Sequence, residues 1–181
     1  MIKFLNYFII IIICFSCNKD KYVKTYTIPK LQPIIETVEL TTHDNKKLFS
    51  WTVPDNWIEG DKSSMRLASF KAPYNSELAD ISITNFSGDG GGLKANVNRW
   101  RKQLDLAPQS EEIINKSILI GNSKLGEYKF IKIINESNVE SAFLCSIIEI
   151  KNSTIFIKMK ASIEGIDKLE KEFLEFCSSF K

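Results

Sequence analysis

The chain has 181 residues with 24 basic and 22 acidic side chains, which gives a formal net charge of +2. This balance shows no excess of the basic residues that a nucleic-acid-binding domain uses, so we expect no nucleic-acid partner. Hydrophobic residues make up 44% of the chain. That share is ordinary for a globular domain with its own core.

Residues 1–16 have the pattern of a lipoprotein signal peptide. Lys3 precedes an apolar run over residues 4–15, which is shorter than the roughly 20 residues of a membrane-spanning helix. Ser16 and Cys17 close the run like a lipobox, in which the cysteine is acylated and becomes the mature N-terminus. Cys14 and Phe15 depart from the usual lipobox residues, so an ordinary cleaved signal and an uncleaved anchor are the alternatives. We predict an extracytoplasmic lipoprotein of the cell envelope, since two or three acyl chains on Cys17 hold a protein stably to a membrane.

Residues 17–43 follow as a tether with two prolines and no helical period. We expect residues 44–181 to form a single domain that begins with three antiparallel strands. Alternation of apolar and polar side chains places these strands at 48–54, 65–72 and 78–86. The interpretation puts Trp51 half-buried on the first strand, and Trp57 in a loop as either a lid on the core or an exposed contact.

A helix is predicted directly after a glycine-rich stretch. Residues 88–92 read Gly-Asp-Gly-Gly-Gly, and helical spacing then relates Leu93, Val97, Trp100 and Leu104. We therefore expect Trp100 in the core and Asp89 near the helix N-terminus, where a carboxylate caps free N–H groups.

Two interpretations of residues 88–92 follow. The N–H groups at a helix start can bind an anion, with Arg99 or Arg66 as a second contact. Alternatively, the glycines supply positive φ angles for a sharp turn from a strand onto the sheet. We favour the turn, because no Lys-Ser/Thr pair follows the glycines as it does in a P-loop, and Arg101 lies far along the helix.

The second half of the chain is rich in β-branched and aromatic residues. Strands are predicted at 117–121, 128–134, 142–150 and 154–161. A terminal helix is predicted from the stripe Ile166, Leu169, Phe173, Cys177 and Phe180. The order of elements predicts an α+β domain, with an antiparallel sheet of six to seven strands covered by two main helices.

The sequence contains no recognisable set of catalytic or metal-binding residues. His43 is the single histidine, which excludes a cluster of histidine ligands. We expect no metal, no cofactor and no enzyme activity. An extracytoplasmic location permits a disulfide, but Cys145 and Cys177 lie in apolar segments, so we predict two buried free thiols.

The segments WTVPDNW (51–57), SSMRLASF (63–70) and GDGGGLKANVNRWRKQL (88–104) resemble a family of uncharacterised bacterial secreted proteins and lipoproteins. Residues 156–159 depart from that family, because Phe-Ile-Lys-Met stands where its members tend to have Trp-Phe-Phe-Lys. The pattern of elements is also similar to the α/β/α sandwich of PsbP and Ran-binding Mog proteins. The resemblance implies a binding or assembly role, and no catalytic residue is carried over.

Two functions remain open on this basis. The first is a non-enzymatic binding or assembly module that is held to a membrane by Cys17 and has an unidentified protein or small-molecule partner. The alternative is a small-molecule or anion-binding lipoprotein that uses residues 88–92. The candidate binding residues are Arg66, Asp89, Gly90, Gly91, Gly92, Asn96, Asn98, Arg99 and Arg101.

Overall fold

A computed structural model describes residues 49–61 and 63–181, all of which belong to one compact unit, Lys46–Lys181. The predicted signal peptide, the tether, Cys17 and His43 lie outside these described residues. None of the helices in the described part is both long and apolar enough to cross a membrane.

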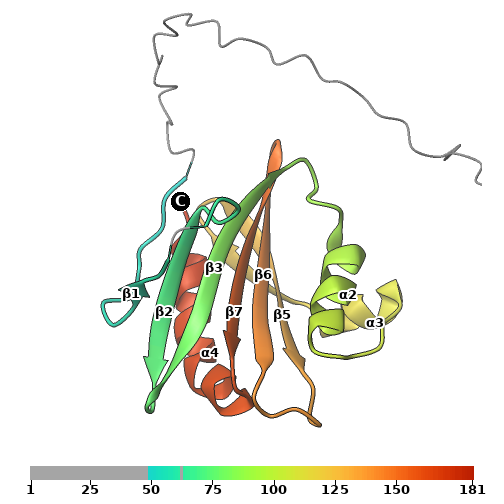
Figure 1. The fold of residues 1–181 in the computed structure, drawn as a ribbon. Helices are drawn as coiled ribbons and strands as arrows, with labels where there is room; N and C mark the ends of the chain where they lie inside the picture. The colour runs from blue at the N-terminus through green and yellow to red at the C-terminus, as the bar shows by residue number, and fades with distance from the viewer. Residues whose placement is uncertain (1–48, 62) are drawn as a thin grey trace, which may run out of the picture. The chain divides into compact units, whose positions relative to one another are not determined.

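Seven strands form one antiparallel sheet in the order β1-β2-β3-β7-β6-β5-β4 (Figure 1). The strands are β1 Ile58–Glu59, β2 Ala68–Tyr74, β3 Glu77–Ser87, β4 Leu119–Ser123, β5 Gly126–Ile134, β6 Ala142–Ile150 and β7 Ser153–Ala161. The helices are α2 Leu93–Gln103, α3 Glu111–Ser117 and α4 Ile163–Ser178. The predicted α+β architecture is confirmed.

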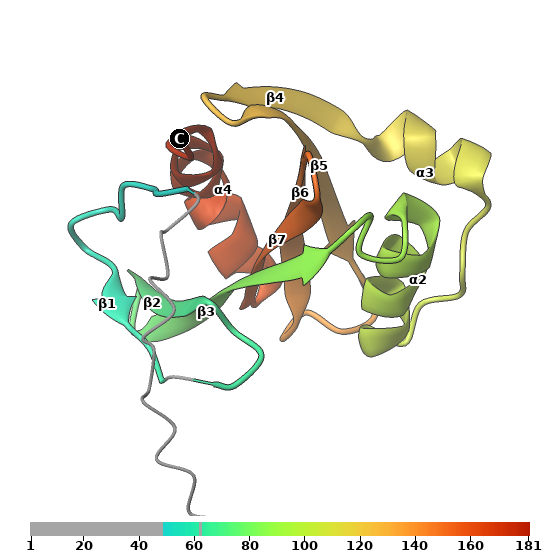
Figure 2. The same cartoon turned by 90° about the horizontal axis from the view of Figure 1, so that it is seen from above.

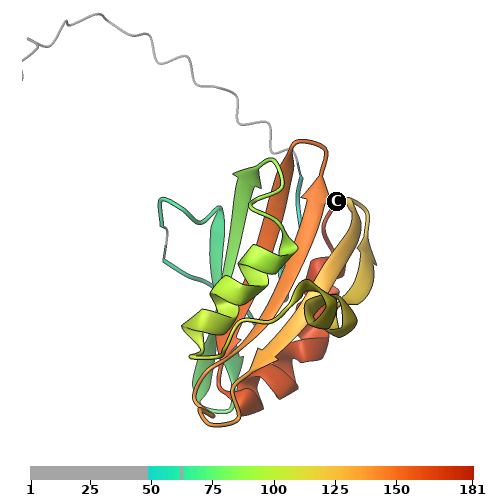
Figure 3. The ribbon, with the colours of Figure 1, turned by 90° about the vertical axis from the view of Figure 1, so that its right-hand side faces the viewer.

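The helices cover opposite faces of the sheet, α4 on one side and α2 with α3 on the other (Figures 2 and 3). Alternation along each strand sends one set of side chains into the cluster under α4 and the other set toward α2. Phe173 and Phe176 of α4 are almost fully buried in the first cluster. Val97 and Trp100 of α2 are buried in the second cluster, which takes its sheet residues from β5, β6 and β7.

The predicted strand at 48–54 is wrong for its described part. Residues 49–54 contain no strand, and this segment pairs instead with the end of the chain through reciprocal backbone hydrogen bonds between Ser50 and Lys181 of 2.7 and 2.9 Å. The alternating aromatic residues Phe49 and Trp51 pack against Phe180. Their period-two pattern thus reflects contact with the C-terminal segment, not with a neighbouring strand.

Trp57 is a lid on the core. Its side chain is buried between Phe70 and Phe176, with ring centroids 6.0 and 4.8 Å away. The indole Nε1 donates a hydrogen bond to Glu172 on α4. This contact decides between the two sequence-based interpretations of Trp57, and the strand β1 begins directly after it, within residues that were expected to be loop.

Both cysteines of the domain are free and fully buried. Cys145 belongs to the cluster under α2, whereas Cys177 lies on α4 in the cluster on the other face. The sheet therefore stands between the two thiols. Burial raises the pKa of both, to about 12 for Cys177, so neither is a reactive thiolate at neutral pH.

We expect an alkylating reagent to leave Cys145 and Cys177 unmodified in the folded protein, because no reagent reaches a fully buried thiol. Denaturation without reductant should make both react completely. Peptide mass spectrometry measures the two sites separately and is not confused by Cys14 or Cys17. A Cys145–Cys177 cross-linked peptide in the non-reduced digest would contradict the prediction.

Candidate functional site

The glycine loop, residues 88–92, connects β3 to α2. Four of its residues have positive φ angles: 69° at Gly88, 61° at Gly90, 92° at Gly91 and 78° at Gly92. Residues that carry a Cβ atom rarely adopt this backbone conformation. At Gly90 an added Cβ would also lie 2.6 Å from the Phe156 ring. The geometry supports the turn interpretation, since both backbone and packing require glycine here.

Asp89 lies close to the start of α2, as expected from the sequence, but it does not cap the helix. The N-cap residue is Gly92, which has no side chain to accept a hydrogen bond. Asp89 lies too early in the loop for that role, and its Oδ1 instead accepts a hydrogen bond of 2.9 Å from the Gly91 N–H. A carboxylate of the chain itself thus occupies the position that an anion would take at this N–H group.

The Asn96 side chain connects the glycine loop to the first turn of α2 through hydrogen bonds. This side chain is 1% exposed, and its Nδ2 donates to the carbonyl oxygens of Gly90 at 3.0 Å and Gly92 at 2.7 Å. The Asn96 Oδ1 accepts a hydrogen bond from Arg99. Asn96 and Arg99 therefore support the loop, and a ligand reaches Asn96 only if these contacts break.

Replacing Asn96 with Ala should lower the free energy of unfolding by about 1–3 kcal/mol, because the Gly90 carbonyl loses its side-chain donor and the Gly92 carbonyl keeps only the backbone N–H of residue 96. Denaturant unfolding followed by circular dichroism measures the change. Replacing the exposed Lys94 on the same helix with Ala is the matched control, with an expected change within about 0.5 kcal/mol. Equal effects of the two substitutions would show that the loop does not depend on Asn96.

Asn98 and Arg101 form hydrogen bonds with the segment that connects α2 to α3. Asn98 bridges both backbone groups of Gln109, with Nδ2 donating at 3.0 Å and Oδ1 accepting at 2.8 Å. The Arg101 Nε donates to the Ala107 carbonyl at 2.8 Å. These two side chains therefore hold the connection between α2 and α3, and they share no contact with the glycine loop.

Arg66 lies on another element, just before β2. Its guanidinium contacts both carboxylate oxygens of Asp80 on β3, at 3.0 and 3.3 Å, and Lys71 of β2 reaches the same carboxylate at 2.8 Å. Burial alone would raise the pKa of Asp80, but the hydrogen bonds from Arg66 and Lys71 outweigh it and hold the pKa below its usual range. The nine candidate residues thus fall into three separate groups, and their joint role in binding stays a prediction.

Two lysines that were not predicted as site residues, Lys158 and Lys160, lie close to Arg66 and its partner Asp80. Lys158 and Lys160 lie on β7, an interior strand, on the face opposite to the buried Ile157 and Met159. Charged side chains at i and i+2 in an interior strand mark a face that is not covered by core packing. That spacing was visible in the sequence and was the signal available for finding them.

Strand register brings these groups together. Ser69, Ser82 and Lys158 stand opposite one another across β2, β3 and β7, and the next row holds Lys71, Asp80 and Lys160. The cluster beneath α2 and α3 contains no residue of β2 or β3. In the view from above, β2 and the start of β3 extend beyond α2 (Figure 2). We call the four cations Arg66, Lys71, Lys158 and Lys160 the basic face.

Within residues 49–61 and 63–181, no group of three or more His, Cys, Asp or Glu side chains is placed to hold a metal ion. No protein-family model matches the chain, and no curated protein matches it.

Solved structures share the fold. Cyanobacterial PsbP (CyanoP) from Synechocystis, a solution structure, matches 76% of this chain and 88% of its own with 16% identity and a TM-score of 0.50. A crystal structure from Bacteroides thetaiotaomicron matches 74% of this chain with 16% identity and a TM-score of 0.45, and this chain spans 44% of it. LpqN, involved in cell envelope biogenesis of Mycobacterium tuberculosis, matches 74% of this chain and 82% of its own with 11% identity and a TM-score of 0.42. The likeness to CyanoP shows that the domain has a PsbP-like fold, as the pattern of elements predicted.

Proposed function

We propose that the protein is a non-enzymatic binding module of the cell envelope, exposed on the extracytoplasmic side and held to a membrane by a lipid on Cys17. The observation that carries the proposal is the basic face, where charged side chains from β2, β3 and β7 gather on a part of the sheet that α2 and α3 leave out of their core. A fold alone does not assign a function. The proposal therefore rests on this face for binding and on the Ser16-Cys17 junction for anchoring.

The glycine loop is a weaker candidate for the binding site. Its Gly91 N–H donates to Asp89, and two of its carbonyls accept hydrogen bonds from Asn96. An anion site at the helix start requires N–H donors, and the N–H groups of Gly91 and Gly92 already donate to the carboxylate and the carbonyl of Asp89. The loop is better explained as a turn that places α2 on the sheet.

Mass spectrometry of the native mature protein tests the anchoring. We expect a mature N-terminus at Cys17 that carries a diacylglyceryl group, and we expect the protein in the membrane fraction. Replacing Cys17 with Ser should abolish the acyl mass and release or misprocess the protein while the domain stays folded. A mature N-terminus elsewhere, or a Cys17 without acyl mass, would overturn the lipoprotein assignment.

A further inference from the structure

We propose that the basic face binds a phosphate group of an anionic ligand, with Lys158 and Lys160 as its main contacts and Arg66 at its border. This inference rests on the binding role proposed above and names the ligand chemistry. It places an anion site on the part of the sheet outside the core beneath α2 and α3, and not at the glycine loop that was the alternative in the sequence analysis.

The basic face carries more positive than negative charge. The basic face holds four cationic side chains, and the carboxylate that contacts them is Asp80, which pairs with Arg66 and Lys71. The register places Lys160 directly opposite Asp80 on the neighbouring strand, yet Lys160 makes no ion pair among the described residues. One carboxylate therefore faces four cations, and the excess positive charge favours an added anion.

The ammonium group of Lys158 has no anionic partner in direct contact. The side chain is partly buried, and its Nζ donates to Gln103 of α2 at 3.0 Å and lies 4.6 Å from the centroid of the Phe143 ring. Neither partner carries a negative charge. Burial lowers the pKa of Lys158, and the positive charges of Arg66 and Lys160 lower it further, although Cys145 and Asp80 act in the opposite direction. A charge in this position is poorly compensated, because buried ammonium groups are normally paired.

Lys158 and Lys160 have hydrogen-bond donors that the described contacts leave unused. An ammonium group has three N–H donors, and the described contacts of Lys158 use one of them on Gln103. Arg66 already donates to Asp80 and Ser69, and Lys71 donates to the same Asp80 carboxylate. Both cations therefore lie at the border of the site, and Lys158 and Lys160 remain its main contacts. The two lysines can therefore donate hydrogen bonds to the oxygens of one phosphate group, and such charge-assisted hydrogen bonds are short and strong.

The ligand has two possible sources, a soluble phosphomonoester or the phosphodiester head group of a lipid near the anchor. We would follow the thermal stability of the mature protein against increasing inorganic phosphate and, separately, against glycerophosphoglycerol, the water-soluble head group of phosphatidylglycerol. Sodium chloride at matched ionic strength corrects for screening. We expect a saturable rise in Tm with at least one probe, and the probe with the higher affinity identifies the source.

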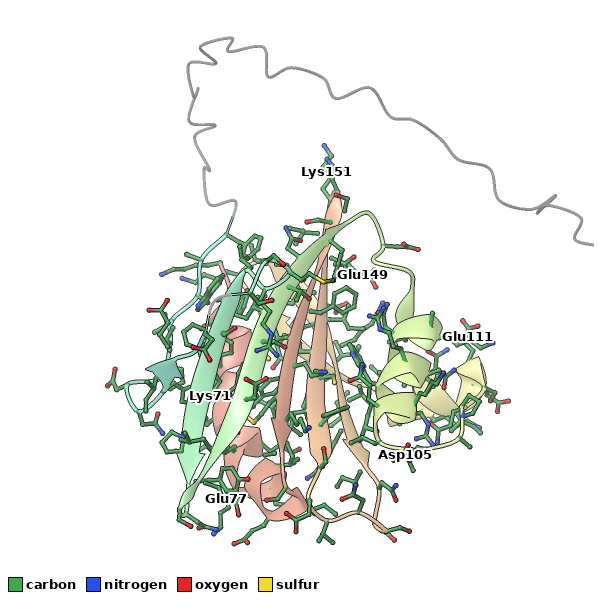
Figure 4. All side chains as sticks on the ribbon, viewed as in Figure 1. Lys71, Glu77, Asp105, Glu111, Glu149 and Lys151 are labelled. Atoms are coloured by element: carbon green, nitrogen blue, oxygen red, sulfur yellow. The ribbon has the colours of Figure 1, made fainter. Side chains whose placement is uncertain are left out.

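The matched variants are Lys158→Gln, Lys160→Gln and, as a control with the same change in charge, Lys151→Gln. Lys151 lies at the tip of the turn between β6 and β7, well away from Lys71 on β2 (Figure 4). Removing either basic-face lysine should weaken binding about tenfold or more, the size expected for one charged hydrogen bond. Lys151→Gln should bind with the affinity of the wild type. Lys160 is exposed, so we expect Lys160→Gln to stay folded.

Two results would overturn the inference: no saturable shift with either probe, or equal affinities in the wild type, Lys158→Gln and Lys160→Gln. The acylation of Cys17 is measured on the same preparation. Acylated protein that binds neither probe would refute the phosphate site and leave the anchor intact. Binding by protein without an acyl group would refute the anchor and leave the phosphate site intact.

Discussion

Replacing Trp100 with Ala should lower the free energy of unfolding by about 3–5 kcal/mol, the usual cost of removing a buried large aromatic side chain. Trp100 is 4% exposed, and its ring meets Phe156 of β7 edge to face, with centroids 6.0 Å apart and planes at 77°. The indole is a main contact between α2 and the sheet, together with Val97 of the same helix and Leu104, its C-cap residue. A cavity at this position cannot be closed without shifting the helix.

Denaturant unfolding of Trp100→Ala measures this cost, with the midpoint and slope fitted together. Replacing Lys102 with Ala is the matched control, because Lys102 lies on the exposed side of the same helix and should change stability by less than about 0.5 kcal/mol. If the Trp100→Ala midpoint barely moves, α2 does not form the second core that the structure shows.

Replacing Gly90 with Ala should cost about 2–5 kcal/mol through two effects. A φ of 61° costs a non-glycine residue about 1–2 kcal/mol. The new Cβ would also lie 2.6 and 2.7 Å from two atoms of the Phe156 ring, and relieving such overpacking adds about 1–3 kcal/mol. Phe156 has little room to move, because Phe86 and Trp100 pack against it.

Gly88→Ala separates the two effects. Gly88 has a φ of 69°, but no heavy atom lies within 4 Å of the Cβ that the substitution adds. We therefore expect Gly88→Ala to cost about 1–2 kcal/mol for the backbone alone, less than Gly90→Ala. Equal losses in the two variants would mean that Phe156 yields freely, and the contact between loop and sheet would then be unimportant.

Periodicity predicted most of the fold because each long element carries its own pattern. The helix expected at Leu93 is α2, and the strand expected at 78–86 is β3, Glu77–Ser87. The terminal stripe through Phe173 and Cys177 is buried as expected. In the N-terminal segment, alternation showed that Phe49 and Trp51 pack on one side, but it carries no information about which element they pack against.

The arrangement of charged residues could not be predicted in the same way. Lys158 comes close to Arg66 because β3 pairs with β7, and the paired residues Ser82 and Lys158 are 76 positions apart in the chain. No local pattern specifies that strand order. The contacts of Asp89 and Asn96 are also set by how the loop turns, so residue type alone could not tell a residue that supports the loop from one that binds a ligand.

The central claim is that an oxyanion binds at the basic face while the glycine loop acts as a turn. An NMR titration of the isotope-labelled mature protein with inorganic phosphate tests it most directly, since every backbone amide reports separately. We predict saturable shifts, with one common affinity, at the amides of Ser69, Ser82 and Lys158, and unchanged amides at Gly90–Gly92. Saturable shifts at Gly90–Gly92 with unchanged amides in β2, β3 and β7 would contradict the account and place the anion at the start of α2.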